Sequence, residues 1–209
     1  MEKNEVVYAK MCVPEEEVER YLQVKDAAEK KLEEIYVKRK LHEAEDRVRL
    51  AEKSVEVLPK IFAAIDQGDI REAVLLLESR FENETDTEKE DLYYEDFFCF
   101  GDPPNIENTI RFYESIYERD GAEKFKKSMI RRCCLFGSET PEVELNQAHE
   151  ELKRVREIID NNPTSEAMKK LRLFGDFTGI QALQQRIFLK EFGIHWKTAM
   201  ELNPDVIYE

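Results

Sequence analysis

Histidine is the side chain best suited to metal binding or acid–base chemistry in this sequence, and its spacing argues against both. His42 and His149 each stand beside a glutamate in a charged stretch. A helical zinc motif needs a second histidine four residues after the first, but Asp46 and Lys153 occupy those positions. We therefore expect both histidines on solvated helix surfaces. The alternative is a metal shared between their two helices, with further ligands from Glu43, Asp46 and Glu150.

The third histidine and the cysteines are expected to have structural roles. His195 precedes the single tryptophan, Trp196, and we expect the pair to pack at the end of a helical bundle. Arg131 and Arg132 could lower the pKa of the neighbouring Cys133 thiol. Cys133 lies on an apolar stripe, however, so a packed thiol is the better prediction. The cysteines fit no zinc spacing and are expected to stay reduced: Cys12, Cys99, Cys133 and Cys134.

No other catalytic motif is recognisable. No glycine-rich loop leads to a Lys-Ser or Lys-Thr pair, as a phosphate-binding turn requires, and no serine stands in a strand–turn–helix elbow. The sequence therefore predicts no catalytic residue, no cofactor and no metal site. It predicts a protein that is not an enzyme, with a helical metal-binding protein or enzyme as the less favoured alternative.

Composition indicates which elements carry these side chains. The 209 residues include only seven glycines and seven prolines, while charged residues make up 37%. Glutamate, lysine, leucine and alanine lose little side-chain freedom in a helix. We predict an all-α fold: a long N-terminal helix followed by a helical bundle or a short stack of helical hairpins.

The charge restricts the partners. A net charge of -14 disfavours direct nucleic-acid binding, which depends on neutralising phosphates. No apolar run approaches the length of about 18 residues that a membrane helix needs, and no leader peptide is apparent. We expect no membrane contact and an intracellular protein, cytoplasmic or nuclear. A basic protein partner stays open.

The first predicted element is a long helix in residues 1–58, ended by Pro59. Apolar residues in its second half recur three and four positions apart, which places them on one stripe, as in a coiled coil. This stripe is the first predicted partner-binding surface; its residues are Leu41, Ala44, Val48, Ala51 and Val55.

An acidic and aromatic segment is the second predicted partner-binding surface. Residues 82–96 contain eight acids and one lysine, and the segment as a whole, residues 82–104, is predicted to be a linker or insertion. Acids keep aromatic side chains soluble, and the aromatics supply apolar area on contact with a partner. The alternative is that these aromatics pack into the protein's own core. They are Tyr93, Tyr94, Phe97, Phe98 and Phe100.

Turn and cap signals divide the rest into a helical hairpin, residues 59–81, and a bundle, residues 105–209. Asp69 with Glu72, Asn105, and Thr140 with Pro141 are predicted helix starts. The first of these helices should bury Ile70, Ala73, Leu77 and Phe81.

Further breaks are expected inside the predicted bundle. Gly121 should separate two helices, and Pro163 should follow the end of another. Short helices are expected over 165–174, 178–192 and 195–202. Stacked hairpins would explain the regular spacing of Gly68, Gly101, Gly137 and Gly175.

One short stretch is basic. Its cations lie within about two and a half helical turns and could bind nucleic acid, receive the acidic segment of the same chain, or form a solvated face. They are Lys124, Lys126, Lys127, Arg131 and Arg132.

The function predicted from these features is a non-enzymatic protein–protein interaction protein, an adaptor or a subunit of a larger assembly. Its partner would be another protein or a second copy of the chain. The alternative is an acidic inhibitor that mimics nucleic acid and binds a basic protein, as some viral proteins do.

Overall fold

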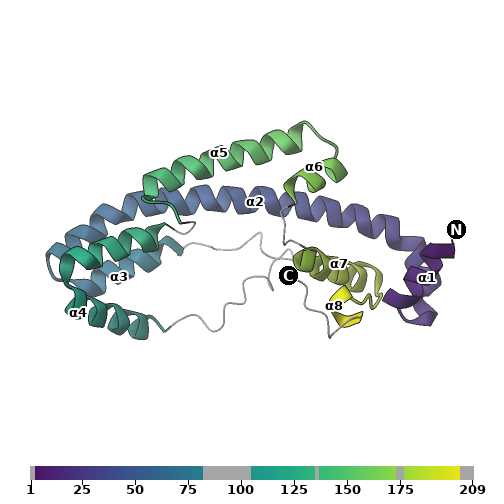
Figure 1. Cartoon of the computed structure of the whole chain (residues 1–209), viewed down its shortest axis with the longest axis horizontal. Coiled ribbons are helices and arrows are strands. Elements are labelled where there is room, and N and C mark those ends of the chain that lie inside the picture. Colours follow the sequence, from purple (N-terminus) through teal and green to yellow (C-terminus); the bar gives the residue numbers. More distant parts are fainter. Residues whose placement is uncertain (1–2, 82–104, 135–136, 173–176, 203–209) are drawn as a thin grey trace. The chain divides into compact units, whose positions relative to one another are not determined.

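The computed structural model of the chain describes residues 3–81, 105–134, 137–172 and 177–202. The regular elements in these ranges are all helices, which confirms the all-α prediction and the long helix near the N-terminus (Figure 1). In chain order they are α1 Lys3–Cys12, the 3-10 helix η1 Glu15–Glu17, α2 Val18–Asp66, α3 Ile70–Glu78, the 3-10 helix η2 Ser79–Phe81, α4 Ile106–Cys133, α5 Pro141–Asp160, α6 Thr164–Leu171, α7 Phe177–Phe192 and α8 Ala199–Leu202.

The chain divides into two compact units. Unit 1 consists of Met1–Leu41 and Val155–Glu209, and unit 2 of His42–Arg154. Helix α2 contributes its first part to unit 1 and its remainder to unit 2. Unit 1 is therefore built from two stretches of sequence far apart, whereas unit 2 is continuous.

The predicted end of the long helix at Leu58 is wrong, because α2 continues through Pro59 to Asp66. Pro59 is exposed, and it lacks the N–H that would otherwise donate to the Val55 carbonyl. Beyond the proline, Ile61 and Ile65 are completely or almost completely buried. Their burial, together with Ala64, stabilises the continued helix by more than the missing hydrogen bond costs.

The real end of α2 lies at Gly68. Its φ of 76° is left-handed, and glycine adopts it without strain. The Gly68 and Asp69 N–H groups donate to the carbonyls of Ile65 and Ala64, at 3.0 and 2.9 Å. This is the hydrogen-bond pattern of a Schellman motif. The Asp69 side chain then accepts from the Glu72 N–H at 2.9 Å and starts α3, which confirms the predicted cap.

The core of unit 2 forms where α3 and α4 pack on the last part of α2. Gly121 interrupts α4 with φ 76° and ψ 168°, so the element is two helices in sequence, as predicted. The Tyr113 and Phe125 rings lie on either side of this break with centroids 6.2 Å apart. Such a short distance requires the chain to reverse at Gly121. The two helices bury Ile110, Tyr113, Phe125, Met129 and Cys133.

Helix α5 begins at the predicted Thr140–Pro141 signal, and the Val143 N–H donates to Thr140 Oγ1 at 3.4 Å. Within unit 2 it runs beside α2, and an ion pair joins Arg47 of α2 to Glu151 of α5 (Figure 1). Ala148 is completely buried on this part of α5. The helix ends at Asp160, ahead of Pro163, as the sequence predicts.

Unit 1 is held together by aromatic packing and by backbone contacts between distant stretches. Tyr21 of α2 lies 5.2 Å from the ring of Phe188 in α7, and the Trp196 ring stacks on Phe188 at 6.1 Å. The Lys197 N–H donates to the Cys12 carbonyl at 2.7 Å. The last turn of α1 is thereby joined to the chain that follows α7.

The predicted helix over 195–202 is present only as α8, from Ala199. Gly193 has a φ of 62° and ends α7, and the Ile194 N–H donates back to Phe188 at 2.9 Å. This turn buries Ile194 and Trp196 completely or almost completely. A helix across 194–198 would lose that packing. Helix α8 therefore begins only after Thr198, whose N–H donates to the Glu201 carboxylate.

Candidate functional site

Arg80 is the most unusual side chain of unit 2, because it is charged and only 3% exposed. Its Nε donates to the Leu77 carbonyl at 2.8 Å, and its Nη1 donates to Ser54 Oγ at 2.9 Å. Its Nη2 donates to the Arg132 carbonyl, near the end of α4, at 3.1 Å. One guanidinium therefore bonds to groups from α2, α3 and α4, as its fork of donors allows.

The position of Arg80 corrects a prediction about Phe81. Phe81 was expected on the buried face of the helix after Asp69, but it is 42% exposed, and Arg80 takes the buried place. The chain tightens to a 3-10 helix over Ser79–Phe81. Because a 3-10 helix has three residues per turn, Arg80 lies on the same side of the chain as the buried Leu77. The sequence contains a signal for this: Arg80 continues the three-four-three spacing of Ile70, Ala73 and Leu77.

Buried thiols and a buried carboxyl group share the electrostatic surroundings of Arg80. Cys133 is completely buried, and burial raises the pKa of its thiol although the Arg80 charge opposes the rise. Burial likewise raises the pKa of Cys134 to about 11. Glu144 of α5 is 1% exposed and acts electrostatically on both Arg80 and Cys133. The predicted packed thiol is confirmed, and this environment favours the protonated form, which is a poor nucleophile.

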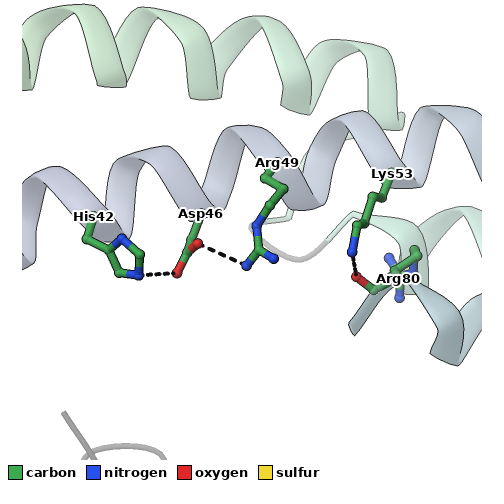
Figure 2. A network of polar contacts seen from close by, with 5 residues as sticks. All are labelled: His42, Asp46, Arg49, Lys53 and Arg80. Atoms are coloured by element: carbon green, nitrogen blue, oxygen red, sulfur yellow. Dashed lines mark hydrogen bonds and ion pairs between the residues drawn. The ribbon is translucent and has the colours of Figure 1, made fainter. Parts of the chain in front are cut away.

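A row of polar side chains leads along α2 toward Arg80, as Figure 2 shows. His42 Nε2 lies 3.3 Å from Asp46, and Asp46 accepts from Arg49 at 2.9 Å. One helical turn further, the Lys53 ammonium donates to the Arg80 carbonyl at 3.1 Å. The spacing of four, three and four residues places the row on one face of α2. It was not recognised in the sequence, although the same spacing identified the neighbouring apolar stripe.

The histidines do not assemble a metal site in the part of the chain that the structure describes. His42 pairs with Asp46, His149 is exposed, and no group of three potential ligands occurs among the described residues. His195 corrects the expectation that it packs with Trp196. Trp196 is buried, but the His195 side chain is 71% exposed and lies 3.2 Å from Glu17.

The apolar stripe predicted to bind a partner is largely covered within the chain. Ala44, Val48 and Ala51 are at most 8% exposed, while Leu41 and Val55 are half-buried. Their burial gives these residues an intramolecular packing role. Partner binding through the stripe stays a prediction, and a partner would have to displace what covers it.

The second predicted surface lies outside the described residues. This applies to each of its aromatic side chains, Tyr93, Tyr94, Phe97, Phe98 and Phe100. Their role in partner binding, and the alternative that they pack in the core, both stay predictions.

An exposed apolar face on α1 was not anticipated. Val7, Tyr8 and Met11 are 60%, 52% and 57% exposed and lie within about one helical turn. The opposite face anchors the helix, since Ala9 and Cys12 are completely or almost completely buried. Burial and a hydrogen bond with Cys12 both raise the pKa of Tyr8. We call Val7, Tyr8 and Met11 the α1 face.

The structure divides the basic stretch into two groups. The Lys126 ammonium lies 2.5 Å from Asp66 and 5.6 Å from the ring centre of Phe62, so it faces α2. The Arg132 guanidinium lies 6.0 Å from the ring centre of Tyr113. Arg132 is exposed, as are the remaining three, which are spaced three and four residues apart on the second half of α4 and make no such ring or ion-pair contact with the described residues of unit 2. We call them the basic stripe: Lys124, Lys127 and Arg131.

None of the described helices combines the length and the apolar character needed to cross a membrane. The sequence matches no known protein-family model, and neither the curated proteins nor the solved structures yield a significant match to it.

Proposed function

We propose that the chain is a non-enzymatic protein–protein interaction protein, an adaptor or a subunit of a larger assembly. The α1 face is the observation that carries the proposal. Three large apolar side chains stay more than half exposed on one short helix, whose other side is firmly packed. Clustered exposed apolar groups mark surfaces that bind other proteins.

The aromatic side chains at 93–100 are the second binding element of the proposal. They would supply additional apolar area to the same partner or to a different one. Free, buried thiols at Cys12, Cys133 and Cys134 support an intracellular partner, because the reducing cytosol keeps such groups reduced.

The test uses the purified full chain and two variants. Val7→Asp with Met11→Asp places charges on the α1 face, and Val143→Asp is the control, since Val143 is a 41% exposed apolar residue of unit 2. Sedimentation velocity detects self-association, and capture from native extract with washes at low salt and at about 1 M salt detects partners. Circular dichroism establishes that both variants keep their helical content.

We expect a complex or oligomer that survives high salt, is formed by the wild-type chain and by Val143→Asp, and is lost in the double variant. Equal retention by the double variant would contradict a binding role for the α1 face. A basic partner that is released at high salt would support the acidic inhibitor instead, because screened ion pairs would then supply the affinity.

A further inference from the structure

We propose that the acidic segment of this same chain, residues 82–96, docks on the basic stripe of α4. Lys124, Lys127 and Arg131 would then form an internal binding surface for carboxylates. This inference concerns a contact within one chain and does not depend on the proposed partner.

Charge is the first argument. The helix that follows Gly121 carries five cations and one acid, Glu123, up to the end of α4. Residues 82–96 carry eight acids and one lysine. These are the strongest local charges of opposite sign in the sequence. Lys124 also lies near Asp120, but Asp120 already pairs with Arg119 at 2.9 Å.

The division of the basic stretch is the second argument. Lys126 pairs with Asp66, and the guanidinium of Arg132, itself an exposed residue, lies over the ring of Tyr113. The three remaining cations are exposed on one side of the helix, over a length of about 10 Å. Carboxylates in an extended segment repeat every 6–7 Å, about two residues apart, and could follow such a row.

Chain connection is the third argument. The hydrogen bond from Arg80 to the Arg132 carbonyl holds residue 80 beside the end of the basic stripe. The acidic segment begins two residues later. Tethering at this point makes docking intramolecular and gives the acids an effective concentration on the order of millimolar. Pairs that are individually worth only about 0–1 kcal/mol can then act together.

Zero-length carbodiimide cross-linking tests the contact, because it joins an amine to a carboxylate that touches it. We expect the full chain, at low salt, to give products that join Lys124 or Lys127 to acids of residues 82–96. Lys169, an exposed lysine of unit 1, should not give them. Isotope-labelled and unlabelled chains are mixed, so that products within one chain are distinguished from products between two.

The sharper test changes a charge without removing an amine. Arg131→Glu should reduce the yield of the Lys127 product about three- to tenfold, the effect of losing and reversing one exposed ion pair. Arg172→Glu changes an exposed arginine of unit 1 and should leave the yield unchanged. Equal yields in both variants, absence of the product, or products only between labelled and unlabelled chains would each overturn the proposal.

Discussion

At the scale of single residues, Arg80 combines burial with three hydrogen bonds to different helices. We expect Arg80→Met to lower the free energy of unfolding of unit 2 by about 2–4 kcal/mol. The change leaves Ser54 without a donor and the buried Glu144 without the nearby positive charge. Urea denaturation followed by circular dichroism measures the loss.

The matched control is Arg111→Met, at an exposed position of α4 outside the basic stripe, which should change stability by less than about 0.5 kcal/mol. Similar losses in the two variants would show that the Arg80 contacts contribute little. The exchange of one arginine for methionine is identical in both, so only the surroundings differ.

Glu17 gives unit 1 a pH dependence. The His195 N–H donates to its carboxylate at 2.8 Å and lowers the pKa of Glu17, with smaller contributions from the His195 ring and Arg20. A carboxyl group whose pKa is lowered by folding stabilises the folded state at pH values above its unfolded-state pKa of about 4.3. That stabilisation is lost as the pH falls through the folded-state pKa.

We therefore expect Glu17→Gln to be less stable than the wild-type chain at about pH 6 and equally stable once the pH has fallen through the folded-state pKa of Glu17 and its carboxyl group is protonated. Glu16→Gln, at an exposed neighbouring position, should follow the wild-type curve throughout. Thermal unfolding across this pH range measures the difference. A constant offset between Glu17→Gln and wild type would contradict the assignment.

At the scale of elements, Pro59 leaves a defect in an otherwise continuous helix. Pro59→Ala should raise the free energy of unfolding by about 1–2 kcal/mol, because alanine restores the hydrogen bond to the Val55 carbonyl. This gain is smaller than the roughly 3 kcal/mol that proline costs inside a helix, because alanine also increases the conformational entropy of the unfolded chain. Glu52→Ala, at another exposed position of α2, is the control for helix propensity and should have a smaller effect.

The reversal within α4 depends on Gly121. Its φ of 76° with ψ of 168° lies in a region that only glycine occupies readily. Gly121→Ala should destabilise unit 2 by about 1–3 kcal/mol. Glu123→Ala, two residues later and exposed, should be close to neutral. Equal melting temperatures for the two variants would show that the chain can reverse here without glycine.

Local chemistry made several of these elements predictable from the sequence. The caps at Asp69, Asn105 and Thr140 and the break at Gly121 depend on neighbouring residues alone. Pro59 was misjudged because distant packing on Ile61 and Ile65 decides whether the helix continues. Tertiary packing of this kind leaves no local signal.

The candidate surfaces were harder to predict for a similar reason. Helical spacing finds an apolar stripe, but it does not say whether Val48 is covered by the same chain or by a partner. The α1 face contains too few apolar residues for a periodic pattern. The contacts of Cys12 decide which side of α1 packs against the rest of unit 1, and the α1 face is exposed because it lies on the other side.

At the scale of the whole molecule, the two units predict a division of stability. Phe125 in unit 2 and Phe188 in unit 1 are both completely buried, and each change to alanine should cost about 3–5 kcal/mol. We expect each variant to lose amide hydrogen-exchange protection mainly in its own unit. Uniform loss along the chain in both variants would show that the units unfold together.

The composition of unit 1 also affects the order in which a nascent chain can fold. Ribosomes release the N-terminal part first, yet Tyr21 and Cys12 contact residues that follow Phe177. Unit 2 is complete once Arg154 has emerged, while unit 1 still lacks α6 and α7. We expect the middle of the chain to fold first during synthesis. Residues 3–41 would then wait with their apolar side chains uncovered, which makes them the natural point of attachment for a chaperone.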